Sequence, residues 1–243
     1  TLLGDTLVQK KIETVKTLMD AMPFIKAFQD EVVVIKYGGS AQTSDTLKAK
    51  FAQDIVLLNL VGVKVVIVHG GGSRISQLLT DLKIPTEFID GERVSTPEVM
   101  RVVEMVLSGE INKEITSLLN SYGAKAIGIS GKDAHFLTAK AKDAKNFGLT
   151  GRVENVKADV VHNLLREGFI PVIAPIGVGD NQETFNMNAD TVAGAIASAL
   201  QASKLIILSL DAIFCSSFSK CSTDTSLSFS PDNTNLFFIS FSK

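Results

Sequence analysis

A short run of β-branched residues that ends in a lysine and two glycines constrains the fold of this chain most strongly. Residues 32–35 are Val-Val-Val-Ile, and Lys36, Tyr37, Gly38 and Gly39 follow directly. Apolar side chains on both faces predict a buried parallel strand. Because glycine has no Cβ, backbone N–H groups beside Lys36 can approach an anion closely. The stretch therefore predicts a strand whose carboxyl end binds a negatively charged ligand.

A second strand followed by glycines repeats this arrangement further along the chain. Residues 63–68 read VKVVIV, and His69, Gly70, Gly71 and Gly72 come next. Two glycine-rich turns after neighbouring strands predict a site for a phosphate-bearing ligand at the carboxyl edge of the sheet. Neither turn has the spacing of a P-loop or of the dinucleotide-binding fingerprint. A tight strand-to-helix turn is the alternative interpretation for either glycine group alone.

Composition and charge narrow the class of protein. The chain has 243 residues, of which 45% are hydrophobic and 21% charged, as in a folded globular protein. A net charge of -2 gives no sign of the basic surface that nucleic-acid binding requires. A membrane-spanning helix needs about 18 consecutive apolar residues, and the sequence contains no such run. We therefore expect neither nucleic acid nor a membrane as partner.

Cysteine usage and the amino terminus bear on the compartment. The two cysteines, Cys215 and Cys221, fit neither a disulfide framework nor a zinc site. The first residues lack the apolar core and the cleavage site of a secretory signal. A reducing compartment is expected, either the cytoplasm or an organelle stroma, and of the two we predict the cytoplasm.

Strand-like and helix-like segments alternate across residues 32–208. This alternation predicts an α/β fold, a three-layer αβα sandwich with an open, mostly parallel sheet. Before the first strand, residues 12–28 have the pattern of an amphipathic helix that Pro23 would kink or restart. That helix has two candidate partners, its own domain or another subunit. The polar segment 131–157 is expected to form a β-hairpin over the site.

A polar hairpin places an arginine beside a helix start. Residues 88–94 contain an Asp-Gly turn typical of a two-residue hairpin. Ser95 is predicted to cap the next helix, with Pro97 in its first turn and Glu98 completing a capping box. Arg93 then lies just before a helix N-terminus, where it would meet a carboxylate of a ligand. The alternative for Arg93 is a solvated surface charge.

Three polar residues alternate before an alanine-rich helix. Asn186, Asn188 and Asp190 would lie on one side of an extended segment. Asp190 is predicted to cap the helix that follows. A cap alone does not require two asparagines upstream, so we interpret the three side chains as a site for a polar ligand.

The chain resembles the amino-acid kinase family. Within it, the chain is most similar to members that transfer the γ-phosphoryl group of ATP to the side-chain carboxylate of N-acetyl-L-glutamate in arginine biosynthesis. The resemblance covers about residues 10–208, and it implies the family's fold, with the acceptor in the amino-terminal half and ATP in the carboxyl-terminal half. The motifs that carry it are VVVIKYGGSA, VVIVHGGGSRI, IDGERVSTPEVM, GLTGRVENV and FNMNADTVAGAIA.

On the nucleotide side, the resemblance assigns a role to four residues. Lys36 would stabilise the transferring phosphoryl group, Asp190 would orient the lysines, and Gly38 and Gly39 would approach the phosphates. The transition state of phosphoryl transfer offers little covalent chemistry, so catalysis is positioning and charge neutralisation. Mg²⁺ is expected to arrive with ATP, and no metal site of the protein's own is expected.

On the acceptor side, the resemblance assigns four more. Gly71 and Gly72 would bind the acceptor through backbone N–H groups, Arg93 would pair with its α-carboxylate, and Asn186 would hold its polar groups. A planar guanidinium fits a carboxylate with two parallel hydrogen bonds, which suits this role better than lysine would.

The resemblance also divides the chain. Residues 1–30 form a helical extension, 31–208 the amino-acid kinase domain and 209–243 an atypical tail. The extension resembles the helix that interlaces dimers into hexamers in arginine-inhibited members. A homo-oligomer, dimer or hexamer, and feedback by arginine are therefore expected.

The tail departs from the family pattern. No glycine follows Gly194 and no arginine follows Arg166, and neither the nucleotide loop nor the second catalytic lysine is recognised. The carboxyl-terminal lobe is expected to be incomplete, and a shifted reading frame or a foreign end is the hypothesis. Two alternatives for function follow: a non-catalytic fragment that binds acetylglutamate or co-assembles with intact subunits, or a kinase of this family acting on carbamate or aspartate.

Overall fold

The computed structural model describes residues 2–38, 44–208 and 213–217. In this part of the chain, six strands form the central sheet in the order β12-β11-β1-β2-β8-β5. All neighbouring pairs are parallel except β11 and β12, which confirms the open, mostly parallel sheet. The strands are β1 (Val32–Tyr37), β2 (Lys64–His69), β5 (Ala126–Ser130), β8 (Ile170–Ala174), β11 (Lys204–Leu208) and β12 (Ile213–Ser217).

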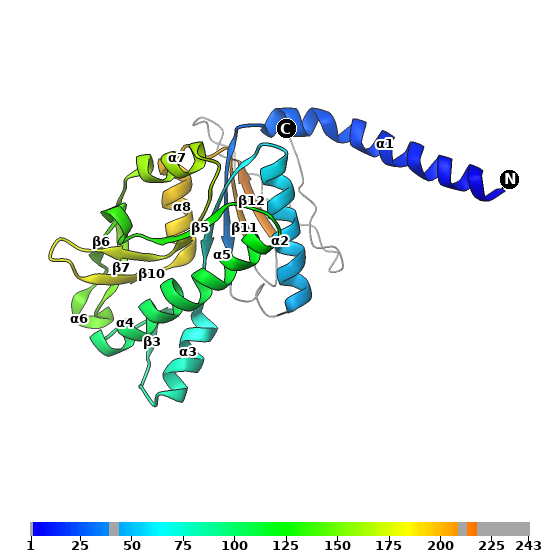
Figure 1. The fold of residues 1–243 in the computed structure, drawn as a ribbon. Coiled ribbons are helices and arrows are strands. Elements are labelled where there is room, and N and C mark those ends of the chain that lie inside the picture. The colour runs from blue at the N-terminus through cyan, green and yellow to red at the C-terminus, as the bar shows by residue number, and fades with distance from the viewer. Residues whose placement is uncertain (1, 39–43, 209–212, 218–243) are drawn as a thin grey trace.

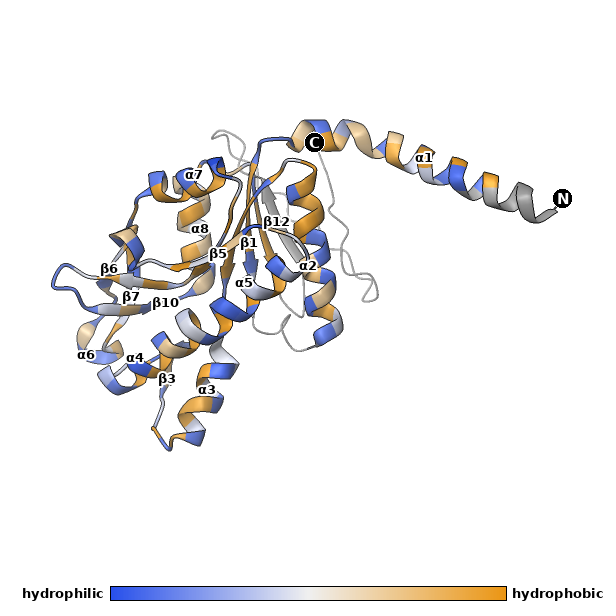
Figure 2. Cartoon of the chain, viewed as in Figure 1, coloured by the Kyte–Doolittle hydropathy of each residue, from blue (hydrophilic) through white to orange (hydrophobic). Residues whose placement is uncertain are grey.

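Helices cover both faces of this sheet and make the expected αβα layers (Figure 1). Alternate residues of one strand enter different cores: Val33 and Ile35 pack in the cluster with Phe51 of α2, and Val34 packs in the cluster with Ile196 of α8. Figure 2 shows the apolar strands enclosed between the helices. The layers are formed by α2 (Asp45–Leu60) and α5 (Asn112–Ser121) on one face, and by α7 (Ala158–Arg166) and α8 (Ala189–Ala199) on the other.

A small barrel lies beside the main sheet. The predicted hairpin over 131–157 is present as β6 and β7, which pair antiparallel. In the barrel these strands are joined by β9 and β10 in the order β10-β7-β6-β9. β10 runs parallel to β7, with Asn186 opposite Thr150. The elements are η3 (Asp133–His135), β6 (Leu137–Ala141), α6 (Ala144–Phe147), β7 (Thr150–Val156), β9 (Ile176–Val178) and β10 (Thr184–Met187).

The predicted polar hairpin follows α3 (Gly72–Asp81) and consists of β3 (Phe88–Ile89) and β4 (Glu92–Arg93). Its two turn residues, Asp90 and Gly91, have φ of 49° and 78°. Positive φ at both central positions is the geometry of a two-residue hairpin loop, which confirms the Asp-Gly turn.

The cap of the helix after this hairpin lies one residue later than predicted. α4 (Pro97–Glu104) has Thr96 at its N-cap, where Thr96 Oγ1 accepts a hydrogen bond from Val99 N at 3.2 Å. The prediction that Ser95 caps this helix is wrong, because Pro97 takes the first helical position and so makes Thr96 the cap. Beyond α4 the chain continues without a break through a π-helix, η2 (Met105–Ile111), into α5.

The amino-terminal helix α1 (Leu2–Phe28) projects from the body of the molecule (Figure 1). It runs through Pro23 as one element, so of the two predicted outcomes, a kink or a restart, the restart is wrong. A single missing N–H leaves the bonds of neighbouring turns in place. Its apolar side chains are exposed, among them Ile12, Val15, Leu18, Met19 and Met22. Within the described residues, no helix has the length and apolar character needed to cross a membrane.

Candidate active site

A lysine and an aspartate from distant parts of the chain form an ion pair at the carboxyl edge of the sheet. Lys36 Nζ, near the end of β1, lies 2.9 Å from Asp190 Oδ1, in the first turn of α8. The lysine side chain is 14% exposed and the aspartate side chain 51%. A carboxylate at a helix N-terminus is stabilised by the helix dipole. The pair therefore holds a largely buried cation at the edge of the sheet with one carboxylate open to the surroundings.

Asn188, and not Asp190, caps α8. Asn188 Oδ1 accepts hydrogen bonds from the backbone N–H groups of Asp190 (2.8 Å) and Thr191 (3.1 Å). The prediction of Asp190 as the cap is wrong, because Asn188 already holds the extended N-cap position. This leaves the Asp190 carboxylate in the first turn, where it meets Lys36.

The two glycine-rich turns lie next to each other, as the sequence predicts. Gly38 N donates to Leu208 O at 3.2 Å, and Gly70 N donates to Tyr37 O at 3.0 Å. Both turns thus follow adjacent parallel strands, β1 and β2. Gly39, the other glycine predicted to approach phosphate, lies outside the described residues.

Between Lys36 and Gly38, Tyr37 anchors the end of β1 in the core. Its ring is buried and stacks on Phe51, with ring centroids 3.9 Å apart. Burial, and to a smaller extent the nearby charge of Glu114, raises the pKa of the Tyr37 hydroxyl. The aromatic residue of this motif is therefore a neutral packing group.

Gly71 and Gly72 open α3 and differ in the space around them. A Cβ on Gly71 would lie 2.4 Å from Ile111 Cδ1 and 2.8 Å from Leu107 Cδ2, so a larger residue would require these buried side chains of η2 to shift. A Cβ on Gly72 would meet nothing within 4 Å. The first N–H groups of a helix have no partner within the helix and carry its positive end. The turn therefore presents backbone donors beside open space.

Arg93 is buried and not a solvated surface charge. It is 6% exposed, and its guanidinium donates to Thr86 Oγ1 (2.8 Å), Ser76 Oγ (2.7 Å) and Gly72 O (3.1 Å). Its guanidinium also lies 4.6 Å from the ring centroid of Phe88. Burial lowers the pKa of Arg93.

These contacts leave the charge of Arg93 without a counter-ion. Its acceptors are all neutral, and no carboxylate of the described residues lies within ion-pair distance of it. The three hydrogen bonds use three of the five N–H groups of a guanidinium. A buried cation with neutral partners favours an anionic ligand. The structure thus brings Arg93 to Gly72 with donor capacity remaining.

Asn186 is held by two buried hydroxyl residues, of which the sequence predicts Ser95 only as a helix cap and Thr150 not at all. Asn186 Nδ2 donates to Ser95 Oγ at 3.1 Å, and Ser95 Oγ lies 3.0 Å from Thr150 Oγ1. Thr150 Oγ1 donates to the carbonyl of Arg93 at 2.6 Å. This chain of bonds connects β10, β7 and β4 and so fixes Asn186 relative to Arg93. The pairing spans distant segments, and no local pattern indicates it.

A cavity of about 220 Å³ lies beside the N-terminus of α8. Asn188 and Thr191 line it, and an ion pair between Lys142 Nζ and Glu92 Oε2 (2.8 Å) closes another side. The remaining lining residues are Gly151, Arg152, Val153 and Met187.

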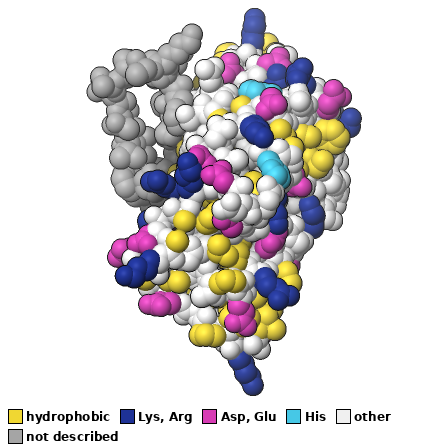
Figure 3. Space-filling model, turned by 90° about the vertical axis from the view of Figure 1, so that its left-hand side faces the viewer, with side chains coloured by type: hydrophobic (Ala, Val, Ile, Leu, Met, Phe, Trp, Pro, Cys, Tyr) yellow, Lys and Arg dark blue, Asp and Glu magenta, His cyan; other side chains and the backbone are white. Residues whose placement is uncertain are grey.

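The surface on the left-hand side of Figure 1 is shown in Figure 3. Among the described residues on this surface, basic and acidic side chains are interspersed and form no large patch of one sign.

Across the residues that the structure describes, no group of three or more His, Cys, Asp or Glu side chains is placed to hold a metal ion. The candidate site consists mainly of cationic side chains and hydrogen-bond donors. Lys36, the N–H groups of Gly71 and Gly72, and Arg93 can each bind oxygen anions. Fold and site together are those of an α/β protein whose groups at the carboxyl edge of a parallel sheet are suited to anionic ligands.

Comparison with known proteins specifies the kind of α/β protein. The amino acid kinase family model matches residues 31–225. An acetylglutamate kinase of Sulfurimonas denitrificans is 63% identical over 203 residues, which are 83% of this chain and 72% of that protein. An acetylglutamate kinase of Nitratiruptor sp. is 61% identical with the same coverage. The chain belongs to the amino acid kinase family.

A solved structure agrees with this fold. N-acetylglutamate synthase from Neisseria gonorrhoeae, complexed with coenzyme A and N-acetyl-glutamate, superposes with a TM-score of 0.72. The superposition covers 82% of this chain and 46% of that chain at 23% identity, so the likeness concerns the fold alone.

Proposed function

We propose that this chain transfers the γ-phosphoryl group of ATP to the side-chain carboxylate of N-acetyl-L-glutamate, forming N-acetyl-L-glutamyl 5-phosphate in arginine biosynthesis. Two supports are independent of each other: relatives named acetylglutamate kinase at 61–63% identity, and the ion pair of Lys36 and Asp190 beside donor groups suited to a carboxylate. The ion pair is the observation that carries the proposal.

The acceptor binds, in this proposal, between the hairpin β3–β4 and the first turn of α3. The remaining donors of Arg93 receive its α-carboxylate, because that cation has only neutral partners. Gly71 and Gly72 donate through their N–H groups, and Asn186, fixed by Ser95, holds the polar groups.

Phosphoryl transfer then needs no general base, because the attacking carboxylate is already ionised near neutral pH. One carboxylate oxygen forms a bond to the γ-phosphorus, and the bond from that phosphorus to the β–γ bridging oxygen breaks, releasing ADP. Lys36 neutralises charge on the equatorial oxygens, and Asp190 keeps its ammonium group in place. The family resemblance assigns Gly38 and Gly39 to the phosphates, because a residue without a Cβ permits close approach. Mg²⁺ bound to ATP supplies further charge neutralisation when present.

The other assignments carried by the family resemblance belong to the same proposal. Residues 31–208 form the catalytic domain, 1–30 an extension and 209–243 an atypical tail. The exposed apolar side chains of α1 support assembly into dimers or hexamers, with arginine as the candidate feedback ligand. The two-cysteine composition supports a cytoplasmic location.

A substrate panel tests the acceptor. ADP release from MgATP is measured with N-acetyl-L-glutamate, carbamate and aspartate, and calorimetry measures binding of each. We expect turnover with N-acetyl-L-glutamate and little with the other two, because a bidentate arginine selects an α-carboxylate, which carbamate lacks, and the acyl amide distinguishes aspartate. If only carbamate or only aspartate is turned over, N-acetyl-L-glutamate is not the acceptor and that compound is. If the chain binds acetylglutamate but transfers no phosphoryl group, it is a non-catalytic fragment and not an enzyme.

A further inference from the structure

A buried histidine and a buried asparagine meet behind the glycine-rich turn. His69 ends β2 and is 0% exposed, and Asn112 begins α5 and is 1% exposed. Asn112 Nδ2 lies 3.2 Å from His69 Nε2, and His69 Nδ1 lies 3.1 Å from Gly70 O. The proposed phosphoryl transfer uses neither side chain, and neither contacts the cavity.

The hydrogen bonds of Asn112 determine the protonation of the imidazole. Asn112 Nδ2 donates to Val172 O at 2.8 Å, and Asn112 Oδ1 accepts from Lys113 Nζ at 3.0 Å. The amide nitrogen therefore faces His69, so Nε2 has to accept. The proton then resides on Nδ1, which donates to Gly70 O. Burial, opposed by the bond to Gly70 and reinforced by the nearby charge of Lys113, lowers the pKa of His69 to about 4, and the ring is neutral.

The hydrogen bond from His69 to the carbonyl of Gly70 orients the N–H group of Gly71. The C=O and N–H groups of one peptide lie in one plane and point in opposite directions. The bond from His69 Nδ1 to Gly70 O therefore sets the direction of the Gly71 N–H. In the same way, the bond from Ile75 N to Gly71 O (3.0 Å) sets the N–H of Gly72.

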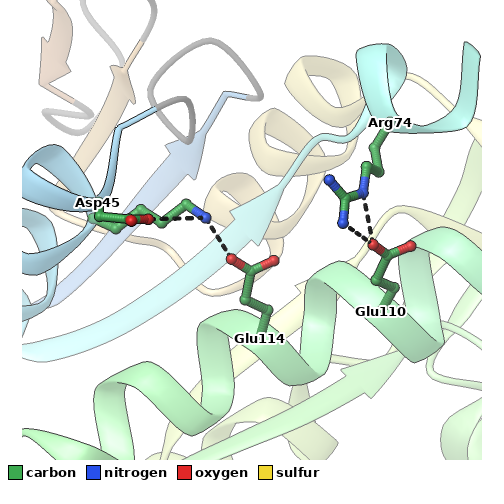
Figure 4. Close-up of polar contacts among 5 residues, drawn as sticks. Asp45, Arg74, Glu110 and Glu114 are labelled. Carbon is green, nitrogen blue, oxygen red and sulfur yellow. Dashed lines mark hydrogen bonds and ion pairs between the residues drawn. The ribbon is translucent and has the colours of Figure 1, made fainter. Parts of the chain in front are cut away.

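The π-helix supports the turn from the opposite side. Leu107 and Ile111 of η2 fill the space in which a Gly71 Cβ would lie. Figure 4 shows Glu110 of η2 paired with Arg74, two residues after Gly72, through a hydrogen bond of 2.6 Å from Nε to Oε1. π-helical turns frequently occur at functional sites. Here the η2–α5 junction places both the packing groups and Asn112 against one short turn.

We infer that His69 and Asn112 are positioning residues that, in one fixed tautomer, aim the Gly71 N–H group at the acceptor. The inference rests on the proposed function for the identity of that acceptor. Asn112 acts through His69, and His69 acts through the Gly70 peptide. Removing either side chain should therefore weaken the affinity for acetylglutamate and leave the affinity for ATP unchanged.

Kinetics of Asn112→Ala against a matched control test the positioning role. Asn120, on the same helix, bonds to both backbone groups of Ala126 at 3.1 and 2.7 Å, at the amino end of β5 and away from the turn. We expect Asn112→Ala to raise the KM for acetylglutamate about tenfold, the effect of one misdirected hydrogen bond, and the KM for ATP less than about twofold. Asn120→Ala should change neither KM. Equal KM ratios in the two variants would overturn the inference.

A measurement on the unmodified protein keeps the test decisive if Asn112→Ala does not fold. Long-range ¹H–¹⁵N correlation NMR distinguishes the two imidazole tautomers. We expect a neutral ring protonated on Nδ1 at pH 7. A ring protonated on Nε2, or a charged ring, would overturn the inference. If the unmodified protein neither binds nor phosphorylates acetylglutamate, the proposed function fails, and the tautomer still decides the His69–Gly70 contact separately.

Discussion

Lys36 Nζ and Asp190 Oδ1 lie 2.9 Å apart, and they join the end of β1 to the first turn of α8. Asn188 takes the capping position and so leaves the aspartate carboxylate available to the lysine. Without Asp190, the ammonium group of Lys36 would lose its counter-charge and its fixed place at the sheet edge. The pair is thus the link between the parallel sheet and the proposed chemistry.

Replacing Arg93 by lysine should weaken acceptor binding. Lysine keeps the charge but cannot form two parallel bonds to a carboxylate, so we expect the KM for acetylglutamate to rise about tenfold to a hundredfold, corresponding to about 1.4–2.8 kcal/mol. Steady-state kinetics at saturating ATP measures this. Arg101→Lys, on the exposed face of α4, serves as control. Unchanged acetylglutamate KM in Arg93→Lys would remove Arg93 from the acceptor site.

Gly71→Ala should destabilise the fold, whereas Gly72→Ala should not. A Cβ at Gly71 would lie 2.4 Å from Ile111 Cδ1, and one at Gly72 meets nothing within 4 Å. Overpacking of this kind costs about 1–3 kcal/mol, and urea unfolding measures the difference. Ile111→Val removes the clashing methyl group and should restore part of the stability of Gly71→Ala. Equal stability of the two alanine variants would show that η2 does not confine the turn.

The pH dependence of stability should include a contribution from His69. Burial lowers its pKa from 6.5 to about 4, so the unfolded state binds its proton first as pH falls. The free energy of unfolding should therefore decrease between about pH 6.5 and pH 4, by at most about 3 kcal/mol from this group.

Two glutamine variants isolate that contribution. Chemical unfolding at several pH values should show a shallower decrease in His69→Gln than in the unmodified protein. His162→Gln, in which the exposed histidine of α7 is replaced, should keep the full decrease. Parallel curves for the unmodified protein and His69→Gln would show that His69 titrates alike in both states.

The apolar side of α1 should mediate assembly. Leu18 is 60% exposed and Met19 66%, and a carboxylate in place of Leu18 would oppose burial of this side of the helix. We expect Leu18→Glu to lower the mass measured by sedimentation. Thr17→Glu places the same charge on the opposite side of α1 and should leave the mass unchanged. A monomeric unmodified protein would contradict the proposed oligomer.

Local signals in the sequence were sufficient for β1 and β2, the two glycine turns and the Asp-Gly hairpin. β-branched runs and glycine act through near neighbours, so the ends of β1 and β2 follow from a few adjacent residues. The two caps were missed by one and two residues, because neighbouring hydroxyl and amide groups compete for the same position.

Contacts between distant segments lay beyond such reasoning. The sequence predicts Ser95 only as a helix cap and assigns no role to Thr150, yet both are buried and together fix Asn186. His69 and Asn112 are 43 residues apart in the sequence and meet where η2 continues into α5. The burial of Arg93 likewise depends on α3 and β3, which are assembled by the tertiary fold.

The most direct test of the central claim is the rate of ADP release with N-acetyl-L-glutamate in Lys36→Ala and Lys64→Ala. Lys64 offers a matched control, because it also pairs with an aspartate, Asp30 at 3.1 Å, but at the amino end of β2. We predict that Lys36→Ala lowers kcat by about 100- to 1000-fold while Lys64→Ala stays within about twofold of the unmodified protein. Equal rates in the two variants would contradict the account.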